Sequence, residues 1–486
     1  MNNKEIVDAA LEKYRRSPKS PFASAKEPRF EPDPHLLGGK TLYEAIKPRS
    51  GLSDAKNNKN AGKEEMDEAI EKSGKVLRAL RKANPAQVES FSINMAQCHF
   101  ARADYYLKKL DIKRALHDCT ETIRLDPSHS GAYQIRGMLY GFKKFYDEAI
   151  ADFTNLIALR PDSAAAYTDR GQVYASKRDL GPAMEDYNHA ITIQGDFAEA
   201  YCGRGWVYSL REDYDAAIAD YTKAIELKSD YSLAYFHRGQ SHAYKKAFGK
   251  AIADFTRAIG MAPDFSEAYD GRGRAYAERE EFDAALADHM KAIEIKDDYS
   301  AAYNNRGIVY GEKGMLDEAL ADFTKAIELD PGDELAHNNR GVAHEKKGAL
   351  DAAITDYTEA IALKPDFTTA YCSRARAHTA KGEFDDAIAD CARALALTGN
   401  SVKARYYRSR AYEQMARRDR EKAVELDAYF VLEEDEELLH PETAFGGSSR
   451  RHPPGVILKV WKKVWRKFRA RFLVLLLRLE KLVAPR

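Results

Sequence analysis

From Ala96 onward, the sequence repeats every 34 residues, nine times in succession and without an insertion. With Ala96 as position 1, position 20 is Ala in all nine units, and position 8 is Gly in seven units and Ala in the other two. Small residues that recur among aromatic ones mark places where two helices approach too closely for a larger side chain. The period therefore predicts a stack of identical helical joints.

The other recurring positions divide each unit into two helices. Positions 4 and 11 are Tyr or His, position 24 is mostly Phe or Tyr, and position 28 is almost always Ile. The spacings 4, 8, 11 and 20, 24, 27, 28 form two stripes with the helical period of 3.6 residues. A Pro at position 32 in five units ends the second helix, because Pro cannot continue it.

This pattern resembles the tetratricopeptide repeat, whose signature is an aromatic residue at 4, 11 and 24, a small residue at 8, Ala at 20 and 27, and Pro at 32. Residues 302–333, AYNNRGIVYGEKGMLDEALADFTKAIELDPGD, match it at every one of these positions. The resemblance implies an all-α, right-handed superhelical solenoid of tandem 34-residue helix-turn-helix repeats. It also implies a non-enzymatic scaffold or adaptor that binds a protein segment in its concave groove.

Composition and pattern divide the chain into six parts. We expect a mostly flexible N-terminal segment, a capping-helix region, nine repeats, a degenerate capping repeat, a linker and a basic amphipathic helix. In that order they are residues 1–61, 62–95, 96–401, 402–435, 436–454 and 455–486.

Two charged positions recur as strictly as the small ones. Position 7 is Arg in all nine repeats and again at Arg408, and position 23 is Asp in all nine repeats. We interpret them as a structural ladder in which each Arg pairs with a second-helix Asp and lies over neighbouring Tyr rings. The alternative is a basic stripe for phosphate, and the equal number of Asp residues argues against it.

The resemblance places partner contacts on the first helix of each repeat, at the variable positions 2, 5, 6, 9, 12 and 13. The candidates on this predicted face are Trp206, Phe236, His237, Gln240, Tyr244, Glu267, Asp270, Arg274, Asn304, Asn305, Asn338 and Asn339. Asn305 and Asn339 fall at position 6, where related arrays use Asn amides to hold the backbone of an extended peptide. We expect these two side chains to be exposed and to hold a peptide backbone; the alternative is that they belong to an ordinary solvated surface.

Several other functions are disfavoured. Position 5 carries no cation in any repeat, which argues against a clamp for a terminal carboxylate. Six His residues stand where other repeats have an aromatic residue, so we interpret them as structural, and we predict no catalytic residue, cofactor or metal site. The five Cys are widely spaced and read as reduced thiols. Residues 62–449 carry a net charge of −15, which disfavours nucleic acid as a partner.

The C-terminal segment has a composition of its own. Residues 450–486 contain twelve Lys or Arg and one acidic residue, with apolar residues at helical spacing between them. Basic amphipathic helices with Trp bind anionic membrane surfaces, and the longest apolar run is too short to span a bilayer. The predicted membrane-binding residues are Lys459, Trp461, Lys462, Lys463, Trp465, Arg466, Lys467, Phe468 and Phe472. The alternative is a soluble scaffold whose C-terminal helix docks on the array or on a partner protein.

The N-terminus bears on the expected compartment. The first thirty residues contain no apolar stretch suited to a signal peptide. We therefore expect a cytoplasmic protein that associates with a membrane if the C-terminal helix binds lipid.

Overall fold

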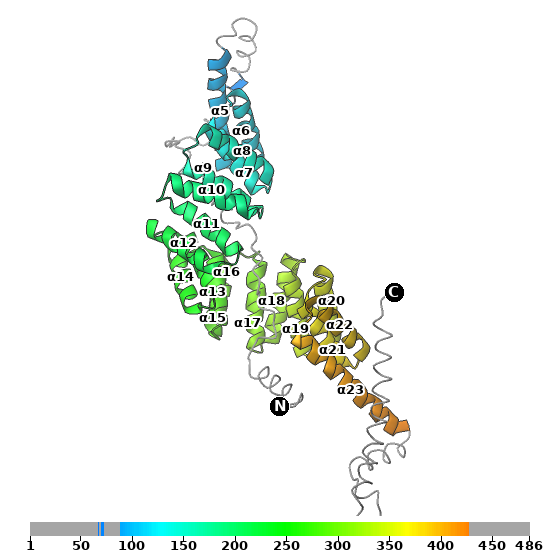
Figure 1. The fold of residues 1–486 in the computed structure, drawn as a ribbon. Helices are drawn as coiled ribbons and strands as arrows, with labels where there is room; N and C mark the ends of the chain where they lie inside the picture. The colour runs from blue at the N-terminus through cyan, green and yellow to red at the C-terminus, as the bar shows by residue number, and fades with distance from the viewer. Residues whose placement is uncertain (1–66, 68–69, 72–87, 427–486) are drawn as a thin grey trace, which may run out of the picture. The chain divides into compact units, whose positions relative to one another are not determined.

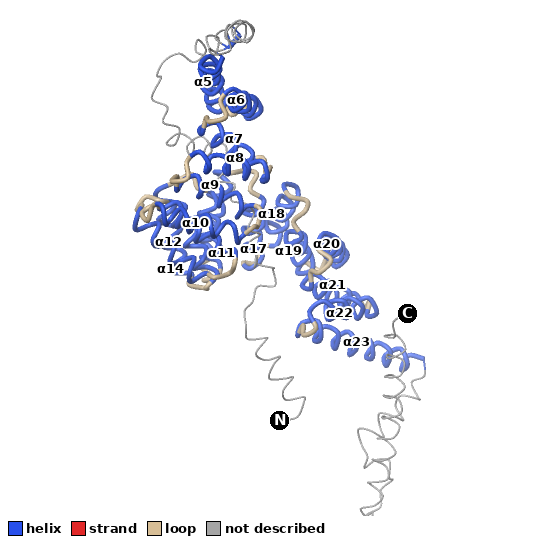
Figure 2. The backbone as a smooth tube through the Cα atoms, turned by 45° about the horizontal axis from the view of Figure 1, so that its top comes forward, coloured by secondary structure: helices blue, strands red, loops and turns tan. Residues whose placement is uncertain are grey.

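The computed structural model describes residue 67, residues 70–71 and residues 88–426, and this part of the chain contains helices and no strands (Figures 1 and 2). The helices are α5 (Val88–Lys108), α6 (Ile112–Leu125), α7 (Ser130–Phe142), α8 (Tyr146–Leu159), α9 (Ala164–Ser176), α10 (Leu180–Ile193), α11 (Ala198–Leu210), α12 (Tyr214–Leu227), α13 (Ser232–Tyr244), α14 (Phe248–Met261), α15 (Ser266–Ala277), α16 (Phe282–Ile295), α17 (Ser300–Glu312), α18 (Leu316–Leu329), α19 (Glu334–Lys346), α20 (Leu350–Leu363), α21 (Thr368–Lys381), α22 (Phe384–Thr398) and α23 (Val402–Leu426).

Helices α5 to α22 form nine antiparallel hairpins, one for each predicted repeat. Each helix packs against the next one along the chain, and from α7 onward each first helix also contacts the first helix of the following repeat. The first helices from α7 to α21 therefore form one continuous layer, and each second helix from α6 to α20 packs between two successive first helices (Figure 1). The predicted all-α solenoid of 34-residue repeats is confirmed.

The small residues lie at the joints of these hairpins. All nine Ala residues at position 20 are fully buried. A Cβ added to Gly307 would lie 2.8 Å from the ring of Phe323, and one added to Gly341 would lie 2.7 Å from the ring of Tyr357. Both rings occupy position 24 of the same repeat, so position 8 stays small because the aromatic ring of the second helix fills its space. The predicted close approach of the two helices is confirmed.

The turn inside each repeat places position 15 in the left-handed region. In the last three repeats this residue is Gly, with φ between 77° and 81°. In the first six it is a non-Gly residue, with φ between 58° and 70°. These six are Leu110, Lys144, Arg178, Glu212, Lys246 and Glu280. A left-handed residue with a Cβ costs ~1–2 kcal/mol, so the first six turns store strain that the last three do not.

The position 7 and position 23 residues form the predicted ladder. In every repeat the Arg of the first helix donates from Nε and Nη2 to the Asp sixteen residues later. The two bonds from Arg306 to Asp322 are each 2.8 Å long. The guanidinium also lies over the position 4 Tyr, at 5.5 Å from the ring centre of Tyr303. The Asp carboxylates are buried, and the structural interpretation is confirmed.

The third nitrogen of these guanidinium groups connects neighbouring repeats. Nη1 donates to the side-chain oxygen at position 25 of the preceding repeat, over 2.8–3.3 Å. The acceptors are Thr120, Thr154, Asn188, Thr222, Thr256, Thr324 and Thr358. Before Arg306, position 25 is Met290, which is 53% exposed and offers no oxygen acceptor. The guanidinium bond to the preceding second helix is therefore missing between repeats 6 and 7, where an ion pair of Lys313 with Asp283 still connects the two.

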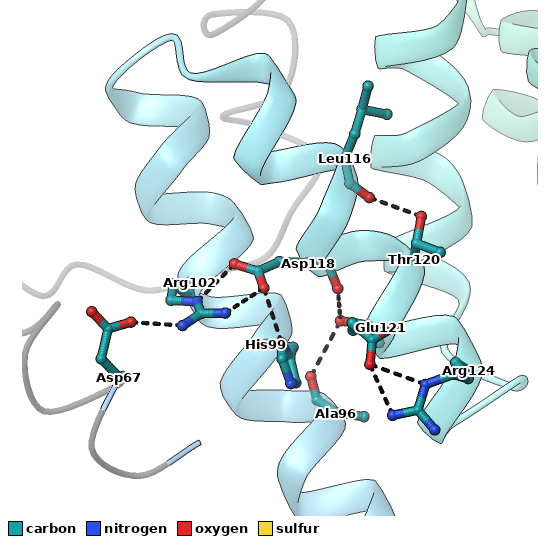
Figure 3. Close-up of polar contacts among 10 residues, drawn as sticks. Asp67, Ala96, His99, Arg102, Leu116, Asp118, Thr120, Glu121 and Arg124 are labelled. Carbon is teal, nitrogen blue, oxygen red and sulfur yellow. Dashed lines mark hydrogen bonds and ion pairs between the residues drawn. The ribbon is translucent and has the colours of Figure 1, made fainter. Parts of the chain in front are cut away.

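Helical residues before α5 cover the start of the array (Figure 3). Asp67 accepts a 2.6 Å hydrogen bond from Nη1 of Arg102, in place of the position 25 acceptor of a preceding repeat. Ile70 packs against the buried cluster of Met95, Ala96 and Leu125. The described part of the predicted cap thus contacts the first repeat, and α5 itself begins at Val88, inside the segment 62–95.

The first rung of the ladder has an additional partner. Nδ1 of His99 donates to Asp118 over 2.9 Å, beside the two bonds from Arg102 (Figure 3). Burial alone would raise the pKa of Asp118, but the hydrogen bonds from His99 and Arg102 outweigh it and lower this pKa below the usual value. The histidine at this aromatic position is therefore structural, as expected.

The array changes character at α23. The chain divides after Arg408 into two units, and Ala404 and Tyr407 in the first unit pack against the last complete repeat. Arg408 continues the position 7 series, but position 23 of this unit is Val424, so the ladder ends at Asp390. None of the described helices combines the length and apolar character that crossing a membrane requires. The predicted flexible segment, linker and C-terminal helix lie outside the described residues.

The strained turns give the first prediction. Replacing Glu280 by Gly removes the clash of its Cβ, and we expect unfolding by urea to require about 0.5–1 kcal/mol more free energy. Glu280→Ala is the matched control, because Ala loses the same side chain and keeps the Cβ. Equal midpoints for the two variants would show that the left-handed turn stores no strain.

The missing bond between repeats 6 and 7 gives the second prediction. In Met290→Thr, the new hydroxyl lies where other repeats accept from Nη1, so we expect it to exceed Met290→Val in stability by about 0.5–1 kcal/mol. Thr and Val have similar shape and helix propensity, so thermal melts of the two variants isolate the hydroxyl. If both melt at the same temperature, the bond to Arg306 does not form.

Candidate partner-binding face

The twelve predicted partner-binding residues all lie on first helices. Trp206 belongs to α11, residues 236–244 to α13, residues 267–274 to α15, residues 304–305 to α17, and residues 338–339 to α19. These five helices contact one another in sequence along the first-helix layer. The structure therefore places the candidates on one layer that extends over repeats 4 to 8.

Most of these side chains lie inside the layer. Eight are buried, namely Trp206, Phe236, His237, Asp270, Asn304, Asn305, Asn338 and Asn339. Asn305 is 6% exposed and Asn339 is fully buried, so the expectation that they are exposed is wrong. The physical reason is that positions 5 and 6 of consecutive first helices face one another, so their side chains fill the space between repeats.

The buried polar residues form a seam of hydrogen bonds between repeats. Nδ2 of Asn305 donates to both carboxylate oxygens of Asp270 at 3.0 Å, and Nδ2 of Asn339 donates to Oδ1 of Asn304 at 3.0 Å. Each bond joins position 5 of one repeat to position 6 of the next, 35 residues later. A buried amide that is bonded in this way fixes how two repeats pack, because a shift would leave both groups unsatisfied.

Asp270 also connects the two helices of repeat 6. Nδ1 of His289, a fully buried residue of α16, donates to Oδ1 of Asp270 over 2.9 Å. Burial alone would raise the pKa of Asp270, but the hydrogen bond and charge of His289, with Arg274 and Asn305, lower it below the usual value. This carboxylate is therefore ionised, and it accepts hydrogen bonds from two nitrogens, Nδ1 of His289 and Nδ2 of Asn305.

At Asn338 the seam lacks the hydrogen bond that the two preceding contacts have. Its side chain is fully buried, and neither Nδ2 nor Oδ1 has a hydrogen-bond partner. The residue at the matching position of the next repeat is Ser373. A buried polar group without a partner costs ~1–3 kcal/mol, so this amide destabilises the contact between repeats 8 and 9 relative to the bonded rungs.

The remaining four candidates are half-buried and therefore reachable from solvent. They are Gln240 and Tyr244 on α13, and Glu267 and Arg274 on α15. Tyr244 stacks on Tyr214, with ring centres 4.7 Å apart. Oε1 of Gln240 accepts from Nδ1 of His237 over 3.1 Å, which leaves its two amide N–H groups for other acceptors. Two neighbouring first helices thus present an amide, an aromatic ring and both charges.

One polar network in this layer was not predicted. Arg376 on α21 donates to both carboxylate oxygens of Glu345 on α19, at 2.6 and 2.9 Å, and Tyr357 donates to the same carboxylate at 2.8 Å. Burial alone would lower the pKa of Arg376, but the bonds to Glu345 raise it above its usual value. Opposite charges at positions 12 and 9 of adjacent repeats were the available sequence signal.

The five Cys side chains are reduced thiols, most of them in the interior of the array. All five Cys are free, four of them buried and Cys98 half-buried. Burial raises the pKa of Cys391 to about 12, and it also raises the pKa of Cys372. Thiols in this state are poor nucleophiles, since the thiolate is the reactive form.

Comparison with models of known protein families identifies the same repeat. Models of the tetratricopeptide repeat match residues 136–199, 198–231, 233–265, 300–333 and 335–367, and a further TPR repeat model matches residues 273–314. The chain is a tetratricopeptide repeat protein. Tetratricopeptide arrays are scaffolds for protein interactions, and typically they are not enzymes.

Solved structures of other tetratricopeptide arrays are similar in part. A chain of the APC/C hetero-tetramer Cut9–Hcn1 is 17% identical over 71% of this chain and 67% of its own, with a TM-score of 0.49. A tetratricopeptide repeat protein from Parabacteroides merdae is 18% identical over 51% and 98%, with a TM-score of 0.43. YrrB, described as a TPR protein with an unusual peptide-binding site, is 28% identical over 38% and 96%, with a TM-score of 0.32. The comparison with curated proteins gives no match.

Proposed function

We propose that this tetratricopeptide array holds an extended segment of a partner protein along the first helices of repeats 5 and 6. The observation that carries the proposal is the group of half-buried side chains on α13 and α15, Gln240, Tyr244, Glu267 and Arg274. They stand at positions that vary between repeats, whereas the ladder positions do not vary and the joint positions are always Gly or Ala. Variable residues on a constant scaffold are where specificity resides.

The chemistry of this group suits a polypeptide. The free N–H groups of Gln240 can bond backbone carbonyls of any sequence, and the half-buried ring of Tyr244, stacked on Tyr214, offers an apolar contact beside them. Glu267 and Arg274 carry opposite charges on the same helix, so they can bond a donor and an acceptor of one segment. We propose a protein partner instead of nucleic acid because residues 62–449 carry a net charge of −15.

The buried asparagines stabilise the first-helix layer and do not contact the partner themselves. Asn305 and Asn339 hold neighbouring first helices at a set distance through their bonds to Asp270 and Asn304. These bonds join α15 to α17 and α17 to α19, so they fix how the following repeats stack on the helix that carries Glu267 and Arg274. Contact between these two amides and a partner would require the layer to open.

The third prediction separates binding from folding. We expect Gln240→Glu combined with Arg274→Gln to lower affinity for a partner, identified by affinity purification with the full chain, at least tenfold. Glu keeps an oxygen that accepts from His237 and removes the amide donors alone. Stability is expected to change by about 0.5 kcal/mol or less, because both side chains are partly exposed. Titration calorimetry and thermal melts measure the two effects.

The matched control changes two exposed lysines of second helices, Lys223→Ala with Lys291→Ala. It is expected to leave affinity and stability unchanged. Asn339→Ala is expected to lower stability by ~1–3 kcal/mol, because it leaves the buried oxygen of Asn304 unbonded. If the Gln240 and Arg274 variant binds as tightly as the wild type, the partner does not lie on this face.

We also propose that the protein works in the cytoplasm and attaches to a membrane surface through residues 455–486, which lie outside the described residues. Support comes from the twelve basic and one acidic residue of 450–486 and from the apolar stripe that includes Trp461, Trp465, Phe468 and Phe472. Charge attraction to anionic lipid and burial of that stripe are both needed for such an attachment.

The fourth prediction tests this attachment on the full chain. We expect the protein to sediment with vesicles that contain phosphatidylserine, less so as salt rises, and a chain that ends at residue 454 to remain in solution. Trp461→Ala with Trp465→Ala is expected to weaken binding to every vesicle. Equal sedimentation of the full and shortened chains would favour docking of the tail on protein.

A further inference from the structure

The turn of repeat 9 brings together three side chains that can bind a metal ion. His378 lies in the last turn of α21, Glu383 precedes α22, and Asp386 lies in the first turn of α22. One ligand atom from each lies within 4.8 Å of the others. Nδ1 of His378 already donates to Oε2 of Glu383 over 2.7 Å, so the imidazole and the first carboxylate are in contact.

The combination does not follow from the repeat itself. These residues occupy positions 11, 16 and 19, and repeat 9 alone among the nine carries His, Glu and Asp there. The other two histidines at position 11 are His242 and His344, which have Ala at position 16 and Lys or Ala at position 19. The packing of the repeat therefore requires none of the three, and Tyr occupies position 11 in the other six repeats.

A cation already occupies part of this cluster. Nζ of Lys381 lies 2.7 Å from Oε1 of Glu383 and 2.6 Å from Oδ1 of Asp351. Hydrogen bonds to Asp351 and Glu383 raise the pKa of this lysine to about 12, and the bonds from Lys381 and His378 lower the pKa of Glu383. Lys381 would keep Asp351 as its partner if a metal ion took its place beside Glu383.

The second ring nitrogen of His378 has a suitable neighbour. Nε2 lies 4.0 Å from Oδ2 of Asp390, the carboxylate that Arg374 holds in the ladder. A metal bound at Nδ1 moves the ring proton to Nε2, where it faces this carboxylate. A carboxylate beside the far nitrogen of a histidine ligand orients the ring and makes it a better ligand.

We propose that His378, Glu383 and Asp386 form a binding site for a divalent transition-metal ion, with Zn2+ as the best fit. One imidazole nitrogen and two carboxylate oxygens are ligands that Zn2+ accepts, at about 2.0–2.2 Å each. Asp386 is exposed and Glu383 is half-buried, so their side chains can close on the ion. The bound ion would join α21 to α22 in the last complete repeat, and water would fill the remaining coordination position.

Titration calorimetry of the full chain with Zn2+ alone tests the site. We expect His378→Tyr to bind one equivalent fewer than the wild type, because it removes the imidazole and keeps a residue that six other repeats carry at this position. His344→Tyr makes the same change in repeat 8 and is the matched control; it is expected to bind as the wild type does. This comparison separates the site from background binding by other histidines.

Two further variants keep the test decisive if His378→Tyr folds poorly. Glu383→Ala introduces the residue that repeats 5 and 8 carry at this position, and we expect at least tenfold weaker binding. Lys381→Met removes the competing ammonium group, and we expect severalfold tighter binding, an effect that unspecific surface binding does not produce. Equal stoichiometry and affinity for the wild type, His378→Tyr and Glu383→Ala would overturn the proposal. This outcome does not depend on whether the first helices of repeats 5 and 6 bind a partner.

Discussion

The pairing of a first-helix Arg with a second-helix Asp is the interaction on which the array depends. Each guanidinium bonds its carboxylate through two nitrogens, and in most repeats it also lies against a Tyr ring and reaches a hydroxyl or amide of the preceding repeat. The carboxylates are buried, and a buried charge that loses its partner destabilises by ~3–5 kcal/mol. One side chain thus fixes the hairpin, its aromatic contact and the stacking of neighbours together.

The sequence was sufficient for the parts of the fold that recur. The period, the two stripes and the small residues at positions 8 and 20 predicted the hairpins, because a contact that is repeated nine times leaves a visible pattern. The pairing of Arg306 with Asp322 was predicted for the same reason. The left-handed residues at position 15 were missed, since six non-Gly residues of four kinds occupy a geometry that Gly would favour.

The candidate site was less predictable, because it depends on distances between helices. Position 6 was correctly placed on the first-helix layer, but whether Asn305 meets solvent or Asp270 depends on how closely α15 and α17 approach. The cluster of His378, Glu383 and Asp386, proposed above as a metal site, was missed for a related reason. His378 and Glu383 are separated by a turn, and their contact follows from the path of that turn instead of from a spacing on one helix.

The exposed Met290 changes where repeats 6 and 7 are joined. Their second-helix side lacks the guanidinium–hydroxyl bond, while their first-helix side has the two bonds from Asn305 to Asp270. The interface between repeats 7 and 8 is bonded on both sides, through Thr324 and Asn339. Repeats 6 and 7 remain joined on the second-helix side by the exposed ion pair of Lys313 with Asp283, 2.5 Å apart. One residue in thirty-four thus decides whether this side of the interface also has a guanidinium–hydroxyl bond or depends on an ion pair that salt can screen.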